Sequence, residues 1–475
     1  MFIGREKELR ILNRLWQSGK RECVVIYGRR RVGKTALIAK FTEGKSTVFF
    51  SALRATPADN LEALSKAIGV LRGQDPSMAP MYRSFDDAFS AVMAFAAEER
   101  VIFVIDEFPY LCDADPSIPS RLQHLLDHDL EVSGLFLILC GSSMSFMEKE
   151  VLSSRSPLFG RRTAQIKLEP LNYIDSAGFH PELSEEDNAL IYGITGGIAH
   201  YINKLDVKDS IRKALLDNYF EPSSYLFEEP SNLLRQELRE PAVYNSIIAA
   251  IAHGASRMSD IASRVQMETA ACARYLNVLI ELDILQKTEP VIGKSKKKVV
   301  YRITDSFYRF WYRFVPENMT AISSGYMGAV YDRAVERYLP DYMGQIFEGM
   351  CRTWLLMHMD ELPFQPVDIG EWWGTDPVQK KEAQLDIVAV SARESGADTG
   401  LRYLIGSCKY RNEKTGVDEL ELIRNYASIF ATAKDECFYY IFSKSGFTEG
   451  LKEASARGEV TLVSLKDMYL SVYTK

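Results

Sequence analysis

The first third of the chain contains three short apolar runs, each followed by small or polar residues. They are CVVIY (23–27), VIFVI (101–105) and LFLIL (135–139), and the segment ALIAKF downstream of the first run has helical character. Apolar runs of this length, bounded by turn residues, are typical of buried strands. Strands that alternate with helices predict an α/β domain built on a parallel sheet.

A different pattern begins near residue 242. Residues 205–240 are rich in charges and prolines, which predicts a helical lid followed by a connector. Three helical segments with short breaks come next, in AVYNSIIAAIAHG, RMSDIASRV and METAACARYLNVLIELDIL, and QKTEPVIGKSKKKVVYRITD has the character of a two-stranded hairpin. This order predicts a winged helix-turn-helix domain.

The last third returns to mixed helices and strands. A helical segment, DYMGQIFEGMCRTWLLMHM, precedes the strands AQLDIVAV and LRYLIGSCKYRN, and the helix GVDELELIRNYASIF and the strand CFYYIFS follow. The order helix, strand pair, helix, strand predicts a second α/β domain.

Bulk properties narrow the environment of this chain. Its 475 residues, 47% of them hydrophobic, suffice for several cores, and a net charge of −7 leaves only a local patch for nucleic acid. The seven cysteines form no C-x-x-C pair, which favours reduced thiols in a cytoplasmic protein over disulfides or zinc. The apolar runs are too short to cross a bilayer, so no membrane partner is expected.

The most specific motif follows the first apolar run. The sequence GRRRVGKT has the spacing of a P-loop, whose backbone N–H groups surround phosphate oxygens while its lysine reaches the β and γ phosphates and its hydroxyl ligates Mg²⁺. It predicts ATP and Mg²⁺ as cofactors. The residues expected to bind ATP are Gly28, Arg29, Arg30, Arg31, Val32, Gly33, Lys34, Thr35 and Ala36, with Thr35 also on Mg²⁺.

The second apolar run ends in two carboxylates. Asp106 is expected to hold Mg²⁺, and Glu107 to orient or deprotonate the attacking water. Arg161 and Arg162 precede a further strand, where a guanidinium could neutralise transition-state charge. Pairing of these arginines with surface acids explains them equally well.

Taken together, FIGREKEL, GRRRVGKT, VIDEF, LCGSS, LFGRR and ITGGIAHYI resemble the archaeal-type ATPases of the STAND group, which are P-loop NTPases related to AAA+ proteins. The resemblance covers about residues 1–235. It implies that Phe2, Ile3 and Arg5 lie near the adenine base and that Arg161 or Arg162 is an arginine finger or sensor. Ala199 stands where the family usually has proline.

The hairpin of the predicted winged helix carries a basic cluster at its tip, Lys294, Lys296, Lys297 and Lys298. Such a cluster suits contacts with the phosphates of double-stranded DNA. A lysine cluster is also typical of a well-solvated turn. In STAND proteins, a winged-helix domain can instead serve as an internal coupling module. All three interpretations stay open.

The last third resembles the C-terminal domain often attached to these ATPases and, in the order of its elements, the PD-(D/E)XK nucleases. The resemblance implies a metal site with Asp386 and the helical acid Glu348, beside Lys409. The third-strand acid is replaced by Ser407, and Gln384 stands where a glutamate is common. Either Glu348, with Glu419 or Glu421, completes the site, or the fold persists without cleavage, which is the favoured interpretation.

The expected architecture is a P-loop ATPase core (1–170), a helical lid and connector (171–240), a winged helix (241–315) and a restriction-endonuclease-like domain (316–475). The expected function is an ATP-dependent molecular switch with a degenerate nuclease-like domain. The alternatives are an ATP-gated, metal-dependent DNA nuclease of defence or mobile-element type, and an AAA+-like remodelling factor that binds no nucleic acid. The oligomeric state is left open.

Overall fold

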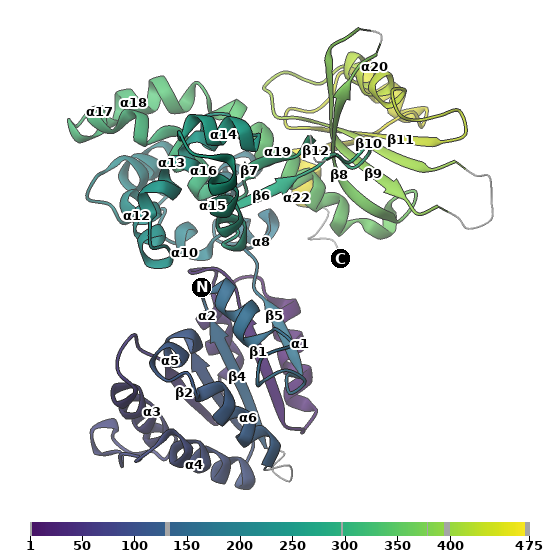
Figure 1. Ribbon diagram of the computed structural model, residues 1–475. Coiled ribbons are helices and arrows are strands. Elements are labelled where there is room, and N and C mark those ends of the chain that lie inside the picture. The colour runs from purple at the N-terminus through teal and green to yellow at the C-terminus, as the bar shows by residue number, and fades with distance from the viewer. Residues whose placement is uncertain (1, 129–133, 296–297, 378, 394–399, 471–475) are drawn as a thin grey trace. The chain divides into compact units, whose positions relative to one another are not determined.

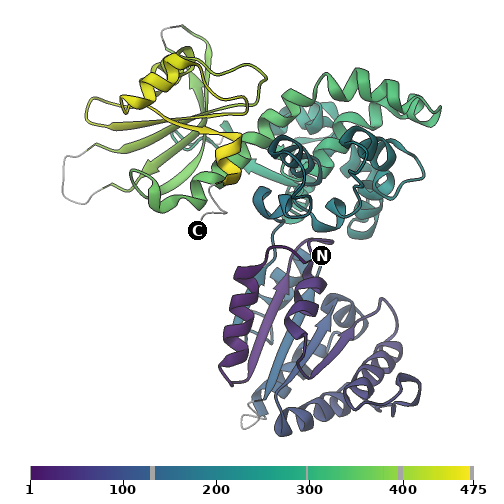
Figure 2. The same cartoon turned by 180° about the vertical axis from the view of Figure 1, so that it is seen from behind.

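The computed structural model describes residues 2–128, 134–295, 298–377, 379–393 and 400–470. The chain forms two compact units, one of Met1–Leu171 with Ile198–His200 and one of Asn172–Gly197 with Tyr201–Lys475. Figures 1 and 2 show the elements of each unit from opposite sides. The division into four domains is finer than these two units and stays a prediction.

The first unit is built on a five-stranded sheet with the order β2-β3-β4-β1-β5 (Figure 1). All neighbouring strands run parallel, so the parallel sheet predicted for the first third of the chain is confirmed. The strands are β1 (Glu22–Tyr27), β2 (Thr47–Ser51), β3 (Val101–Asp106), β4 (Leu135–Gly141) and β5 (Ala164–Lys167).

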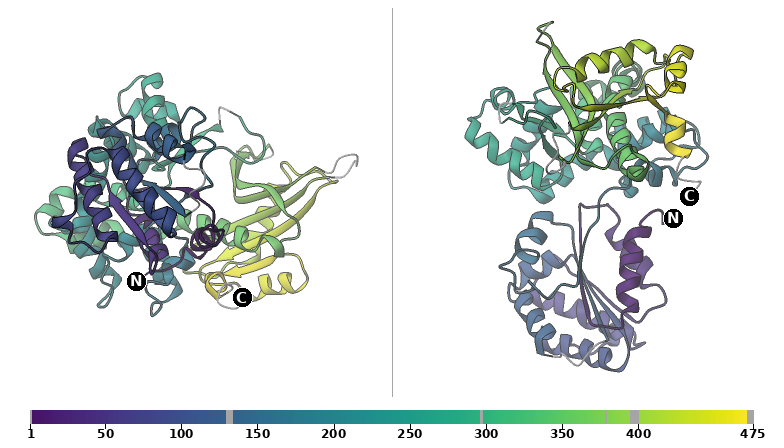
Figure 3. Two further views of the ribbon diagram at one scale, coloured as in Figure 1. Left: turned by 90° about the horizontal axis from the view of Figure 1, so that it is seen from below. Right: turned by 90° about the vertical axis from the view of Figure 1, so that its right-hand side faces the viewer.

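Helices cover both faces of this sheet (Figure 3). On one face, Trp16 and Phe41 from two helices pack against Phe136 of β4, with ring centroids 5.3 to 6.4 Å apart. A sheet covered on both faces requires continuous apolar strands, which is the pattern seen in the sequence. The helices are α1 (Glu6–Gln17), α2 (Lys34–Thr42), α3 (Pro57–Leu71), η1 (Pro76–Met78), α4 (Phe85–Glu98), α5 (Phe108–Ala114), α6 (Ile118–His128), α7 (Met144–Phe146) and η2 (Met147–Val151).

Short helices and one hairpin connect the two α/β parts. The helices are α8 (Tyr173–Ala177), α9 (Glu185–Thr195), α10 (Ala199–Ile202), α11 (Ile211–Leu215), η3 (Leu216–Phe220), α12 (Tyr225–Glu237), α13 (Pro241–Ala252), α14 (Met258–Arg264) and α15 (Thr269–Glu281). The antiparallel hairpin of β6 (Leu285–Thr288) and β7 (Val300–Ile303) follows them. Three helices and a hairpin thus occur in the order expected from residue 242 onward.

An aromatic helix, α16 (Ser306–Phe314), fills the core that these helices enclose. Phe307 stacks on Tyr201 at 4.3 Å between centroids, and Phe310 meets Tyr219 and Tyr342 edge-on at 5.2 and 5.6 Å. Its dense aromatic sequence is therefore explained by packing. The elements after it are η5 (Pro316–Asn318), α17 (Met319–Ser323), α18 (Met327–Val330), η6 (Tyr331–Glu336), α19 (Leu339–Met357) and η7 (Met359–Glu361).

The last third contains a separate mixed sheet with the order β12-β11-β10-β9-β8. The three strands β8 to β10 form an antiparallel meander, whereas β10, β11 and β12 run parallel. Helix α19 packs on one face, and two further helices bury the other (Figure 1). The elements are β8 (Pro366–Thr375), β9 (Glu382–Ser391), β10 (Arg402–Lys409), α20 (Val417–Ala427), β11 (Glu436–Ser443), α21 (Glu449–Ala456), β12 (Thr461–Ser464) and α22 (Leu465–Leu470).

Two further observations concern the state of the cysteines and the length and polarity of the helices. All seven cysteines carry free thiols. Within the ranges that the structure describes, no helix is both long enough and apolar enough to pass through a membrane.

Candidate functional site

The loop between β1 and α2 needs glycine at two positions for different reasons. A Cβ on Gly28 would lie 2.4 Å from the carbonyl oxygen of Leu168, because the backbone after β5 passes directly beside the loop. Gly33 has φ of +102° and open space around it, so only its backbone conformation favours glycine. The loop therefore exposes main-chain groups without a side chain in the way, which is the shape a phosphate cradle requires.

Lys34 is folded into this loop. Its side chain is buried, and Nζ donates hydrogen bonds of 2.8 Å to the carbonyl oxygens of both Gly28 and Arg29. Burial lowers the pKa of the Lys34 ammonium, while the negative charges of Glu107 and Asp106 act in the opposite direction. A positive charge thus lies within the loop, next to two carboxylates.

Those carboxylates stand where β3 ends, beside the end of β4. The Thr35 hydroxyl donates to Asp106 Oδ2 at 3.1 Å, so the first residues of α2 and the end of β3 meet. Glu107 adopts a left-handed backbone conformation with φ of +50°. Its carboxylate accepts hydrogen bonds from the Ser142 hydroxyl at 2.8 Å and the Ser142 N–H at 3.4 Å. The adjacent strands therefore fix both acids at one edge of the sheet.

The N-terminal segment reaches the same loop. Arg5 Nη2 donates to the Val32 carbonyl oxygen at 3.0 Å, and Phe2 is half-buried. Arg30 Nη2 donates to the Tyr110 hydroxyl at 2.6 Å. The structure thus brings Arg5 to the P-loop, while Thr35 and Ala36 remain exposed at the start of α2.

The two arginines predicted as catalytic have other partners. Arg161 makes two hydrogen bonds of 2.7 Å to the carboxylate of Asp127. Arg162 donates to the Leu152 carbonyl oxygen at 3.1 Å and to the Gln165 side chain at 3.2 Å. In this arrangement both arginines stabilise the segment before β5, and a role in catalysis stays a prediction.

Two partners of the acids were not predicted from the sequence. Ser142 belongs to the run LCGSS, and its hydroxyl and N–H hold Glu107 from the neighbouring strand. Burial raises the pKa of the Cys140 thiol of β4 well above its usual value, and the negative charge of the nearby Asp106 acts in the same direction. The run LCGSS places small polar residues after a strand, but nothing in it identifies their partners.

A second cluster lies in the mixed sheet, where β9 and β10 run side by side. Asp386 Oδ2 accepts a hydrogen bond of 2.8 Å from the Cys408 N–H, and the Ser407 hydroxyl lies 3.4 Å away. Ser407 also donates to Glu419 Oε1 of α20 at 2.8 Å, and Lys409 Nζ is 3.1 Å from that oxygen. The Glu419 carboxylate of the next helix therefore lies beside Ser407, the residue that replaces the expected third-strand acid.

Burial dominates the electrostatics of this second cluster. It raises the pKa of Asp386, although Lys409 and the Cys408 N–H oppose the rise. Burial, with the negative charge of Asp386, also raises the pKa of Glu348 to about 7. Glu421, the other acid considered from α20, is exposed.

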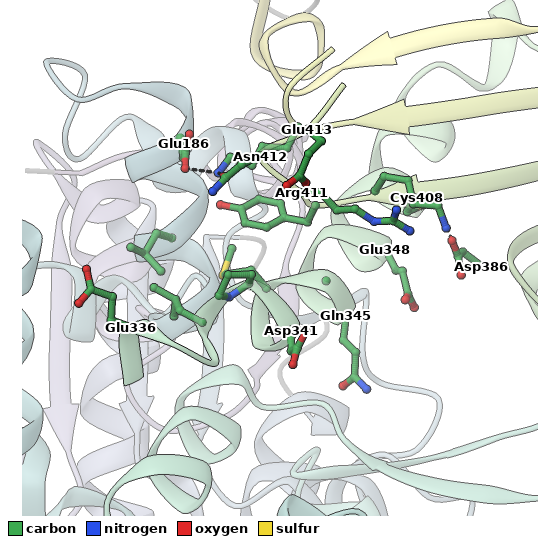
Figure 4. A pocket seen from close by; sticks show the side chains of 18 of the residues that line it. Glu186, Glu336, Asp341, Gln345, Glu348, Asp386, Cys408, Arg411, Asn412 and Glu413 are labelled. Atoms are coloured by element: carbon green, nitrogen blue, oxygen red, sulfur yellow. Dashed lines mark hydrogen bonds and ion pairs between the residues drawn. The ribbon is translucent and has the colours of Figure 1, made fainter. Parts of the chain in front are cut away.

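A pocket of about 880 Å³ opens beside these residues (Figure 4). Asp341, Gln345 and Glu348 of α19 line one side of it, and Asn412 and Glu413 lie opposite. Among the described residues, no group of three His, Cys, Asp or Glu side chains is arranged to hold a metal ion.

The hairpin tip, for which DNA contact is one of three open interpretations, packs against β8. Lys294 Nζ is 2.7 Å from Asp368, and the Val291 N–H donates to the Glu371 carbonyl oxygen at 2.9 Å. The buried Glu371 carboxylate also pairs with Arg302 of β7 at 2.6 Å and with Arg352 of α19 at 3.0 Å. Lys296 and Lys297 lie outside the described residues, and the Lys298 N–H donates to the Ser295 carbonyl oxygen.

Comparison with known proteins extends these observations. The sequence matches a family model described as an ATPase domain predominantly from Archaea over residues 2–205 and one of archaeal and bacterial proteins of unknown function over residues 311–420. The uncharacterized protein MJECL04 of Methanocaldococcus jannaschii is 31% identical over 403 residues, which are 84% of this chain and 86% of the relative.

Two further similarities concern the nucleotide-binding part and the fold. The uncharacterized ATP-binding protein MJ0423 of the same organism is 53% identical over 45 residues, 10% of this chain and 76% of that protein. The Walker-type ATPase PABY2304 of Pyrococcus abyssi superimposes with a TM-score of 0.52 at 19% identity, over 66% of this chain and 96% of that one. At this identity the likeness shows the fold alone.

Proposed function

The chain is an ATPase that belongs to one family with the Methanocaldococcus jannaschii protein MJECL04, and we propose that ATP binding and hydrolysis operate it as a molecular switch. The observation that carries the proposal is the pair of contacts Thr35–Asp106 and Ser142–Glu107, next to a glycine loop that encloses Lys34. These contacts support the proposal, because a cation, a hydroxyl and two carboxylates are the groups that phosphoryl transfer uses.

Each residue then has one task. Lys34 exchanges its hydrogen bonds to the loop carbonyls for bonds to the β and γ phosphates of ATP. Thr35 and Asp106 would hold Mg²⁺, which neutralises phosphate charge when bound. Glu107, held by Ser142, accepts the proton of the attacking water. Arg5 supports the loop from outside and is expected near the adenine base, together with Phe2 and Ile3.

Replacement of Lys34 by alanine tests this proposal. Lys34→Ala removes the charge that contacts the phosphates, so ATP binding and hydrolysis are expected to be lost together. Lys40→Ala is a matched control, because Lys40 is an exposed lysine of the same helix and pairs with Glu43 at 2.8 Å. Normal hydrolysis by Lys34→Ala would contradict the assignment of the P-loop.

A role of Arg161 as an arginine finger requires the arginine to leave Asp127. Asp127→Asn weakens that ion pair and should raise the hydrolysis rate if Arg161 acts on the phosphates. An unchanged rate, together with a lower melting temperature, would assign Arg161 to structure alone.

The C-terminal domain is proposed to have the nuclease-like fold without cleavage. The order α19, β8, β9, β10, α20, β11 supports the fold, and the lack of a three-ligand group among the described residues argues against an assembled metal site. One observation favours the alternative of an ATP-gated nuclease. Glu419 lies next to Ser407 and Lys409, where it could join Asp386 on a divalent metal.

A plasmid nicking assay with Mn²⁺ and ATP separates these two functions. No nicking is expected from the unmodified chain. Nicking that disappears in both Asp386→Asn and Glu419→Gln, but not in the exposed control Glu421→Gln, would establish the nuclease.

Residues 241–315 are proposed to form a winged helix that couples parts of the chain. The engagement of Lys294 and Val291 with β8 supports coupling over a free DNA-binding wing. Titration of duplex DNA at two salt concentrations tests this. Strong, salt-sensitive binding that Lys294→Ala weakens would favour the DNA-binding interpretation, and an absence of binding also fits the remodelling factor.

A further inference from the structure

A second hollow lies in the helical half of the second unit, and Asp341 and Gln345 of α19 line both this hollow and the pocket described above. It has a volume of about 400 Å³ and is bounded by the turn after α13, by β7, by α16 and by the start of α19. Volumes of this order accommodate small molecules, because ligand pockets typically measure about 300–1,000 Å³. The hollow is therefore large enough for a metabolite-sized ligand.

Three arginines from two elements line this hollow. Arg302 comes from β7, and Arg309 and Arg313 stand one turn apart on α16. Side chains four positions apart share one face of a helix, so the latter two guanidinium groups face the same region. The acidic residue in the lining is Asp341 of α19.

The charges of these arginines are unequally compensated. Arg302 pairs with the buried Glu371 at 2.6 Å. The side chain of Arg309 donates a hydrogen bond to the carbonyl oxygen of Ile303 and, within the described ranges, to no carboxylate. Arg313 is exposed and forms no ion pair with any described residue. Two guanidinium groups therefore line the hollow without a direct ion pair to a described carboxylate, although the negative charges of Glu348 and Glu371 act on Arg309.

A guanidinium group in a partly buried position, such as that of Arg309, favours a nearby anion. A guanidinium cannot lose its proton at ordinary pH, so neighbouring arginines cannot relieve their repulsion by titration. Burial lowers the pKa of Arg309, and the positive charge of Arg302 acts in the same direction, whereas Tyr342, Glu348 and Glu371 act in the opposite direction. Each guanidinium can donate two parallel hydrogen bonds, a geometry that matches phosphate oxygens.

We propose that Arg309, Arg313 and Arg302 form a binding site for the phosphate group of a small ligand, of the size of a nucleoside monophosphate or smaller. Arg309 and Arg313 contact the phosphate directly, while Arg302, held by Glu371, adds positive potential. Gln345, which also lines the hollow, offers an amide to the remainder of the ligand. This site lies outside the P-loop, and it shares Asp341 and Gln345 of α19 with the pocket beside the mixed-sheet cluster.

Calorimetric titration of the full chain tests the proposal. Pyrophosphate, inorganic phosphate and AMP serve as separate probes, in a Lys34→Ala background that suppresses binding at the P-loop. Arg313→Ala is expected to weaken binding about 10- to 100-fold, because it removes hydrogen bonds to a charged group. Arg309→Lys keeps the charge but loses the paired geometry, so an intermediate loss is expected.

Arg239→Ala is the control, since Arg239 is an exposed arginine of the same unit outside the hollow. Tighter binding of AMP than of phosphate would identify a nucleotide ligand, and equal binding would identify the phosphate group alone as the determinant. The proposal is overturned if no probe binds, or if the two arginine variants bind every probe as tightly as Arg239→Ala does. Binding of duplex DNA alone would also overturn it.

Discussion

Replacement of Glu107 by glutamine separates binding of ATP from its hydrolysis. Glutamine has the same size as glutamate, and its amide oxygen can still accept the Ser142 hydrogen bond of 2.8 Å. The substitution leaves the left-handed backbone at φ of +50° as it is, because both residues have the same branching at Cβ. What it removes is the negative charge that accepts the proton.

The expected effect is large on one quantity and small on the other. A positioned general base contributes about 10²- to 10⁴-fold to the rate, which corresponds to ~3–5 kcal/mol of activation free energy. The affinity for ATP should stay near that of the unmodified protein, because Lys34 and Thr35 keep their positions. Phosphate release under saturating ATP measures the rate, and titration with a fluorescent ATP analogue measures the affinity.

Glu148→Gln is a matched control, since Glu148 is an exposed glutamate of η2. A hydrolysis rate of Glu107→Gln equal to that of this control would refute the role as base. A parallel loss of ATP binding would instead assign Glu107 to nucleotide binding or to the fold.

Three further substitutions test other parts of the molecule. Ser142→Ala removes a hydrogen bond to a charged group, so the hydrolysis rate should fall by about 10- to 100-fold, which is less than the largest fall expected for Glu107→Gln. A rate equal to that of the unmodified protein would show that other contacts hold Glu107. Gly28→Ala places a methyl group 2.4 Å from the Leu168 carbonyl oxygen and should lower the free energy of unfolding by ~1–3 kcal/mol in urea titrations, whereas Gly33→Ala meets only the backbone cost of ~1–2 kcal/mol. Glu348 binds its proton more tightly in the folded chain, since its pKa rises from 4.5 to about 7, so its contribution to stability is present below pH 4.5 and is lost as the pH rises to 7. Glu348→Gln should therefore gain up to ~3 kcal/mol over the unmodified chain across that interval in metal-free buffer, and a pH-independent difference would contradict the burial of this carboxyl group.

Much of the fold could be predicted from local sequence patterns. The apolar runs before Gly28, Asp106 and Gly141 became adjacent parallel strands, because a strand buried on both faces must be apolar throughout. The P-loop is contiguous in sequence, and at Gly33 only the backbone conformation favours glycine, whereas Gly28 also lies against the distant Leu168. The apolar strands and the spacing of the P-loop do not depend on distant residues, so they could be predicted.

The partners of the site residues could not be predicted in the same way. Ser142 and Glu107 are 35 residues apart, and only the order β3-β4 brings them together. The hairpin was predicted from the segment QKTEPVIGKSKKKVVYRITD, whereas its attachment to β8 depends on a main-chain hydrogen bond of Val291 that the sequence does not reveal. Nothing in the local sequence GEWWG predicts that Glu371 is buried. Its burial depends on Arg302 and Arg352, which are distant from it in the chain.

The ion pairs of Glu371 with Arg302 and Arg352 should constrain which substitutions occur at these positions across the family. Removing one partner from a buried charge costs about 3–5 kcal/mol, whereas replacing a buried ion cluster with apolar residues as a set can be neutral. Loss of Arg302 or Arg352 alone should therefore be selected against while Glu371 persists. Across the family these three positions are expected to change together, so their covariation would report whether β7, α19 and β8 stay joined in each member.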